Sequence, residues 1–226
     1  ALLPSGEVVW LETRCSKVDD MRMPNAAVLL VSRDVTERKL AEDDLKRWEF
    51  AQHESELERL AFTDELTGLN NRKQFETALN GIKQQCLRTA SKFALLYLDL
   101  DNFKAVNDTF GHRAGDQVLC DVAQKLKSLV RETDIVARWG GDEFVILLTN
   151  LEQSTSVSQI CEKLIAGVAA LEVSGDTQIG LSIGVALYPE DAQEIDDMHQ
   201  CADSALYDAK SAGKNQFKTY STTLQK

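Results

Sequence analysis

Residues 138–144, Arg-Trp-Gly-Gly-Asp-Glu-Phe, constrain the fold of this chain more than any other segment. They join two runs of β-forming residues, 135–139 and 144–148. Two adjacent glycines between such runs favour a hairpin, because glycine tolerates the positive φ angles of a tight turn. The segment therefore predicts a hairpin whose turn carries two neighbouring carboxylates.

A second acidic segment follows residues 93–98, an apolar run typical of a buried strand. The run ends at Asp99, and Asp101 follows two positions later. If the two segments form neighbouring strands, Asp99 and Asp142 converge at one end of a sheet. Two carboxylates beside a glycine turn suit Mg²⁺, with Mn²⁺ as a substitute, and a nucleoside triphosphate. The alternative is a pair of unrelated surface acids at strand ends.

Composition and charge restrict the class of partner. The chain has 226 residues, enough for one or two domains, and its 43% hydrophobic content supports a sizeable core. The formal net charge of −11 argues against a nucleic-acid-binding surface, so any phosphate site must be a local cationic pocket. The five scattered cysteines show no metal-binding or redox spacing, which favours reduced thiols in the cytoplasm.

Residues 1–34 contain two strand-like runs, 6–14 and 26–32, and the chain opens inside strand-like sequence, as a piece of a longer protein does. No apolar run is long enough to span a bilayer and no signal peptide is visible, so we expect no membrane contact from this segment. Membrane segments further upstream are left open.

Residues 36–62 predict one long helix, because they lack Gly and Pro and are rich in Glu, Lys, Arg and Leu. Thr36 is the expected N-cap. One set of residues in this helix has the a/d spacing of a coiled-coil seam. This spacing does not continue to Leu40, Leu45 and Trp48, which indicates a register shift. The seam residues are Phe50, His53, Leu57 and Leu60. The alternative is a solvated single helix.

The remaining sequence alternates helical and strand-like patterns and predicts an α+β fold with helices packed on a mixed sheet. Helices are expected at 116–130, 156–171 and 196–212, the last stopped by Gly213. A long strand or strand pair is expected at 177–187 and a last strand at 216–220.

Five separated blocks together resemble the diguanylate cyclase family, which is named after the motif at residues 140–144. The blocks are residues 64–72, 99–116, 131–134, 140–144 and 207–215. The resemblance covers about residues 63–220 and implies a central sheet like that of nucleotidyl cyclases and polymerase palm domains. Residues 33–39 also resemble the end of a PAS sensor domain, for which a plain β-hairpin is the alternative. The implied organisation is a partial PAS domain at 1–35, a linker helix at 36–62 and the cyclase domain at 63–226.

The resemblance implies a metal site made of Asp99, the Leu100 carbonyl, Asp142 and Glu143, with catalytic roles for Asp142 and Glu143. It also implies substrate contacts from Phe103, Lys104, Asn107, Asp116, Gly140, Gly141, Lys210 and Lys214.

Three of these assignments have alternatives or departures. Asn107 and Asp116 resemble the guanine-reading pair, and Asp116 is alternatively the N-cap of the next helix. Lys210 and Lys214 are alternatively lysines placed by the helix dipole at a C-terminus. Family members often carry Arg where this chain has Lys214, which keeps the charge and loses the bidentate fork.

Arg131 and Asp134 resemble the family's inhibitory site, which binds the product cyclic di-GMP. The alternative is an ordinary ion pair at a helix end. A second arginine often lies on the next helix in the family, where this chain offers only Lys163.

The predicted function is therefore an enzyme that condenses two GTP into cyclic di-GMP and two pyrophosphates, as a homodimer controlled by an N-terminal sensor and by its product. One alternative is a binding module that holds GTP or cyclic di-GMP without turnover. Another is a structural dimerisation unit, against which the intact metal and phosphate blocks argue.

Overall fold

The computed structural model describes residues 9–18, 27–151, 155–172 and 178–220. The chain divides into two compact units, Ala1–Glu58 and Arg59–Lys226, which are described separately.

The first unit contains an antiparallel hairpin of β1 (Leu11–Val18) and β2 (Ala27–Asp34). Leu11 pairs with Asp34, and the backbone N–H of Val35 extends the ladder by donating to the Trp10 carbonyl at 2.8 Å. This register places β1 later than the predicted strand at 6–14, of which residues 6–8 lie outside the described residues. The shift arises because β2 continues to Asp34, and its partner strand begins opposite that residue, at Leu11.

Helix α1 (Thr36–Phe62) has the predicted bounds, but Thr36 is its first residue and not its N-cap. The Asp34 carboxylate accepts the Thr36 N–H at 2.9 Å and the Thr36 hydroxyl at 2.6 Å. Lys39 N–H donates to the Val35 carbonyl, which begins the helical bonding pattern. The hydrogen bonds from Thr36 lower the pKa of Asp34. The acidic side chain just before the helix thus replaces threonine as the capping group.

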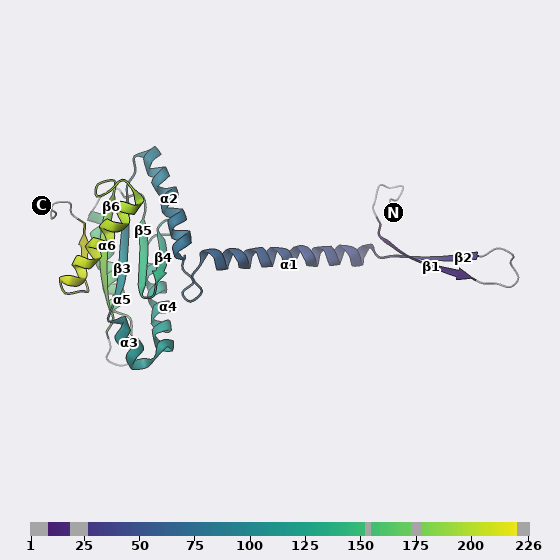
Figure 1. Ribbon diagram of the computed structural model, residues 1–226, viewed down its shortest axis with the longest axis horizontal. Coiled ribbons are helices and arrows are strands. Elements are labelled where there is room, and N and C mark those ends of the chain that lie inside the picture. Colours follow the sequence, from purple (N-terminus) through teal and green to yellow (C-terminus); the bar gives the residue numbers. More distant parts are fainter. Residues whose placement is uncertain (1–8, 19–26, 152–154, 173–177, 221–226) are drawn as a thin grey trace. The chain divides into compact units, whose positions relative to one another are not determined.

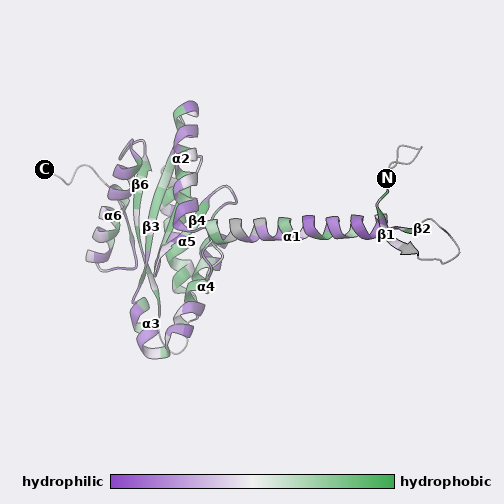
Figure 2. Cartoon of the chain, turned by 45° about the vertical axis from the view of Figure 1, so that its right-hand side comes forward, coloured by the Kyte–Doolittle hydropathy of each residue, from purple (hydrophilic) through white to green (hydrophobic). Residues whose placement is uncertain are grey.

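Hydrophilic residues dominate α1, with hydrophobic residues between them (Figure 2). The large hydrophobic side chains described as exposed on this helix are those of Leu40, Leu45, Trp48, Phe50 and Leu60. Self-association through this helix stays a prediction. Within the described ranges, no helix is both long and apolar enough to cross a membrane.

The second unit is built on a five-stranded mixed sheet in the order β4-β5-β3-β6-β7 (Figure 1). Every neighbouring pair is antiparallel except β6 and β7, which are parallel. The strands are β3 (Phe93–Asp101), β4 (Ile135–Gly140), β5 (Glu143–Leu148), β6 (Gly180–Tyr188) and β7 (Phe217–Thr219). The predicted hairpin and mixed sheet are confirmed.

Helices cover both faces of this sheet, and the central strand β3 is therefore buried on both sides. Its residues Phe93, Leu95 and Tyr97 pack with α2 (Arg72–Thr89) and α6 (Ile195–Ser211). Its intervening residues pack with α3 (Phe103–Phe110), α4 (His112–Leu129) and α5 (Thr155–Ala169). The near-continuous apolar run of β3 is what this double burial requires.

Sequence patterns missed α2 and α3 and placed the start of α4 four residues too late. A capping signal for α2 is present, since the Asn71 side chain accepts the Gln74 N–H at 3.0 Å. Residues 180–188 form one strand, and Thr177 lies outside the described residues. Gly213, with φ 118°, follows α6 as predicted.

Candidate active site

The predicted meeting of the two acidic segments is present at one end of the sheet. Strands β3 and β5 pair so that Asp99 lies directly opposite Glu143. The Leu100 N–H donates to the Asp142 carbonyl at 3.3 Å, which ties the glycine turn to β3. Directly opposed residues of an antiparallel pair project to the same face, so the two carboxylates share the face covered by α2 and α6.

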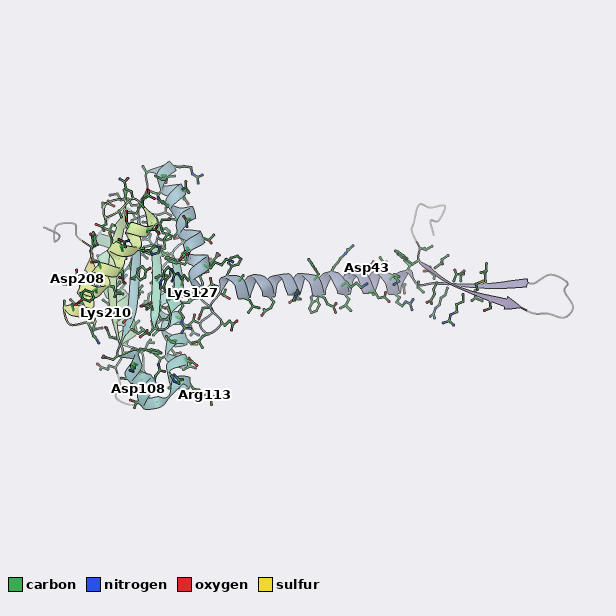
Figure 3. The ribbon with its side chains drawn as sticks, in the orientation of Figure 1. Asp43, Asp108, Arg113, Lys127, Asp208 and Lys210 are labelled. Atoms are coloured by element: carbon green, nitrogen blue, oxygen red, sulfur yellow. The ribbon has the colours of Figure 1, made fainter. Side chains whose placement is uncertain are left out.

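Lys210 brings a positive charge to this pair from the last turn of α6 (Figure 3). Its Nζ lies 2.7 Å from Oδ2 of Asp99, and the Asp99 side chain is 15% exposed. A lysine in the last turn also complements the helix dipole. The contact with Asp99 shows that Lys210 serves the acidic site as well as the helix end.

The site holds more negative than positive charge. Burial raises the pKa of Asp99, Lys210 opposes this, and the charges of Asp142 and Asp101 raise it further. Burial also raises the pKa of Glu143, and the neighbouring charge of Asp99 adds to the effect. A bound cation would favour the ionised form of both carboxyl groups and would therefore lower both pKa values.

These residues fit a hard divalent cation, because their donors are carboxylate and carbonyl oxygens. Lys210 already places an ammonium group against Asp99 as a stand-in positive charge. In the described part of the chain, no three His, Cys, Asp or Glu side chains gather as a metal-binding group. The expected ligand set also includes a backbone oxygen, the Leu100 carbonyl.

The turn itself is open to a ligand. Gly141 has φ +53°, and a Cβ atom added to Gly140 or Gly141 would meet nothing within 4 Å. A phosphate group can therefore approach the backbone of both residues without a steric barrier.

The predicted phosphate turn at Phe103 and Lys104 is the N-terminus of α3. Its N-cap, Asn102, has φ 65° and makes no side-chain capping bond. The first N–H groups of a helix have no intrahelical carbonyl partner, so they remain suitable for phosphate oxygens. Phe103 is buried and anchors this end of the helix, whereas Lys104 is exposed.

Asp101, which the motif analysis did not assign, holds the segment at Lys214 and Asn215 in place. It is buried, and its carboxylate accepts the Ser182 hydroxyl at 2.9 Å and the Asn215 N–H at 2.8 Å. Lys214 precedes Asn215 in a turn with positive φ, and its Nζ lies 3.4 Å from Oδ1 of Asn102. The sequence signal for Asp101 was the alternation of side chains along β3, which places Asp101 on the same face as Asp99.

Helices α3 and α4, which carry Asn107 and Asp116, pack against each other. A Cβ added to Gly115 would lie 2.0 Å from Oδ1 of Asn107, so the amide rests against the residue before Asp116. Asp116 is exposed inside α4, whose N-cap is Gly111. The alternative role of Asp116 as an N-cap is therefore wrong, because α4 begins before it.

Arg131 and Asp134 line a separate cavity of about 540 Å³, together with Lys127, Asn70 and other residues. The Asp134 carboxylate accepts the backbone N–H groups of Arg131 and Thr149, both at 3.0 Å. The described side chains of Arg131 and Asp134 form no ion pair with each other, so the ion-pair alternative is not observed. The Arg131 side chain is exposed beside the cavity.

The chain is similar to known proteins over most of its length. The family model described as "Diguanylate cyclase, GGDEF domain" matches residues 61–216. Diguanylate cyclase DgcM of Escherichia coli K12 is 39% identical over 188 residues, which cover 83% of this chain and 42% of DgcM. The bifunctional diguanylate cyclase/cyclic di-GMP phosphodiesterase MucR of Pseudomonas aeruginosa is 36% identical over 88% of this chain and 29% of MucR.

Solved structures show the same similarity. The coiled coil and GGDEF domain of DgcB from Caulobacter crescentus, solved in complex with c-di-GMP, gives a TM-score of 0.73 at 29% identity, covering 82% of this chain and 99% of that one. The GGDEF domain of TpbB from Pseudomonas aeruginosa gives 0.68 at 36% identity over 70% of this chain and 94% of that one. The chain spans less than half the length of the curated relatives named above. The family model nevertheless matches residues 61–216, and the chain belongs to the diguanylate cyclase GGDEF domain family.

Proposed function

We propose that this protein condenses two GTP molecules into cyclic di-GMP and releases two pyrophosphates. The observation that carries the proposal is the opposition of Asp99 and Glu143 beside the open glycine turn, with Lys210 at 2.7 Å from Asp99. Phosphoryl transfer requires positioning and charge neutralisation above all, and this end of the sheet supplies carboxylates, cationic side chains and accessible backbone in one place.

In the proposed site, Mg²⁺ or Mn²⁺ would be held by Asp99, Asp142, Glu143 and the Leu100 carbonyl. The bound ion supplies neutralisation of the triphosphate charge. Lys210, Lys214 and the N–H groups at the start of α3 bind phosphate oxygens. The 3′-hydroxyl of one GTP attacks the α-phosphorus of the other, pyrophosphate leaves, and a carboxylate of the site accepts the hydroxyl proton.

Guanine is proposed to bind between α3 and α4. The Asp116 carboxylate can accept from the guanine N1–H and N2 amino groups, and the Asn107 amide can pair with O6 or N3. Adenine lacks this donor pattern and would leave polar groups of the site unpaired, which favours strong rejection of ATP.

Product control is proposed at the cavity beside Arg131 and Asp134. An exposed guanidinium suits both a phosphate and the Hoogsteen edge of guanine. Lys163 on α5 is the available cation where the family often has a second arginine, so inhibition is expected to be weak.

A homodimer is required because each domain holds one GTP and the product joins two nucleotides by two symmetric bonds. We propose that α1 tethers two copies and that the β1–β2 hairpin is the end of a PAS sensor that controls their encounter. The cytoplasm, where GTP is available, is the proposed location.

The test is to incubate the chain with GTP and Mg²⁺ and to identify the products by mass. Wild type should form cyclic di-GMP, and Asp142→Ala should form none while keeping its thermal unfolding temperature. Asp197→Ala, an exposed acid in the first turn of α6, is the matched control and should retain activity. GTP binding without product from the wild type would favour the non-catalytic alternative.

A further inference from the structure

The guanidinium of Arg138 connects the glycine turn to a loop far away in the sequence. Its Nε and Nη2 donate to the Gly141 carbonyl at 3.0 and 2.8 Å. Its Nη1 lies 3.1 and 3.3 Å from the two carboxylate oxygens of Asp64. Both charged side chains are largely buried, at 14% and 24% exposure. The arginine therefore uses its planar fork on a backbone carbonyl and its remaining donor on a carboxylate.

Asp64 is itself held rigidly. Its Oδ1 accepts the Thr67 N–H at 2.9 Å and the Thr67 hydroxyl at 2.7 Å. Its backbone N–H donates to the Leu69 carbonyl at 2.8 Å. Burial raises the pKa of Asp64, but the bonds from Thr67 and the charge of Arg138 outweigh it and leave the pKa lowered. Asp64 is therefore an ionised, fixed partner for Arg138.

The loop that carries Asp64 is joined to the edge of the sheet. Asn70 forms a parallel bridge with Ala137. Its carbonyl accepts the Arg138 N–H at 3.0 Å, and its side-chain amide donates to the Val136 carbonyl at 3.0 Å. The next residue, Asn71, donates to the Ala61 carbonyl in the last turn of α1. A continuous set of hydrogen bonds thus runs from the end of α1, through this loop and Arg138, to the glycine turn.

Few other contacts fix the position of the glycine turn. Gly141 has no side chain, and the ladder register shifts between Arg138 and Gly140. On the β3 side, the bond from Leu100 N–H to the Asp142 carbonyl is long, at 3.3 Å. The Gly141 carbonyl, one residue before Asp142, is where Arg138 holds the turn.

We infer that Arg138 is a positioning residue for the reaction: fixed by Asp64, it holds the Gly141 carbonyl and thereby sets where Asp142 and Glu143 present their carboxylates. The inference rests on the proposed metal site and adds a control point to it. Because Arg138 is linked to the end of α1, a displacement there can reach the acidic turn without any contact with GTP.

Arginine and lysine should differ sharply in this role. A lysine keeps the charge near Asp64, but it cannot donate two bonds to the Gly141 carbonyl while it contacts a carboxylate. Loss of such a supporting contact commonly weakens metal binding or activity by about 10- to 100-fold. A small misplacement of reacting groups has a similar effect on turnover.

The experiment compares wild type with Arg138→Lys and Asp64→Asn. Mn²⁺ affinity is measured by electron paramagnetic resonance of free Mn²⁺ in the presence of a non-hydrolysable GTP analogue. The same samples give kcat and KM for GTP, the unfolding temperature, and calorimetric affinity for cyclic di-GMP. Arg88→Lys, an exposed arginine in the last turn of α2, is the matched control.

Arg138→Lys should weaken Mn²⁺ binding and lower kcat by about 10- to 100-fold. Affinity for cyclic di-GMP should stay within about threefold of wild type, because Arg131 and Asp134 line a separate cavity. Asp64→Asn should produce a smaller effect of the same kind, and the double variant should be no worse than Arg138→Lys alone. Because Asn has nearly the same volume as Asp, Asp64→Asn also keeps the test decisive if Arg138→Lys fails to fold.

Mn²⁺ affinity and kcat within twofold of wild type in a folded variant, with only a lower unfolding temperature, would overturn the inference and leave Arg138 a purely structural residue. A wild-type chain that binds no Mn²⁺ would instead refute the proposed metal site itself.

Discussion

Gly115 allows the predicted guanine-reading pair to form, and its replacement by alanine tests that pair. A Cβ at this position would lie 2.0 Å from Oδ1 and 2.9 Å from Cγ of Asn107. Carbon–oxygen contacts begin at about 3.3 Å, so the amide must move by roughly 1.3 Å. Such a displacement removes a hydrogen bond to guanine, which contributes about 0.5–1.5 kcal/mol. The expected loss in kcat/KM for GTP is about two- to twelvefold.

Gly81→Ala is the matched control, because Gly81 lies within α2 and an added Cβ meets nothing within 4 Å. It should raise the free energy of unfolding by up to about 1 kcal/mol through helix propensity and leave kcat/KM unchanged. Gly115→Ala should not show this full gain, because the crowding opposes it.

The assay is steady-state formation of cyclic di-GMP from GTP, with ATP as the competing substrate, and urea denaturation of the same samples. Discrimination between GTP and ATP should fall in Gly115→Ala and stay constant in Gly81→Ala. If Gly115→Ala keeps both the wild-type kcat/KM and the wild-type discrimination, Asn107 does not read guanine.

Four further predictions concern other parts of the chain. Gly184→Ala should lower the free energy of unfolding by about 1–3 kcal/mol or more in urea denaturation, because its Cβ would lie 2.1 Å from a backbone oxygen of α6; full stability would contradict this close packing. Arg131→Ala should relieve product inhibition in progress curves without changing the initial rate, and wild type without calorimetric binding of cyclic di-GMP would refute the site. Replacing Leu57 and Leu60 with Glu should lower specific activity most at low protein concentration, and a rate independent of concentration in both proteins would show that α1 does not control assembly. Burial lowers the pKa of His199 below its ordinary 6.5, so the unfolded chain binds more protons than the folded chain below that pH. The free energy of unfolding should therefore fall as pH drops below 6.5. His199→Asn should reduce this loss between about pH 7 and 5, and an unchanged slope of stability against pH would refute the prediction.

Local sequence patterns determined much of this protein. The hairpin at residues 135–148, the buried strand that ends in Asp99 and the helix over 36–62 all follow from periodicity, glycine placement and composition over short windows. Motif order identified the family, and the family match over residues 61–216 confirms it. These features were accessible because each depends on residues that are neighbours along the chain. The N-cap of the helix over 36–62 was predicted wrongly, because the side chain of Asp34, two residues before Thr36, accepts the Thr36 N–H.

Only the tertiary structure decided which of these residues act together. The pairing of β3 with β5 sets Asp99 opposite Glu143, and the approach of α6 adds Lys210. Asp64 and Arg138 are separated by 74 positions, and no local pattern links them. Contacts of this kind depend on strand register and on how helices pack across a sheet. A shift of one residue in register would turn Asp99 to the opposite face, and no local propensity encodes that choice.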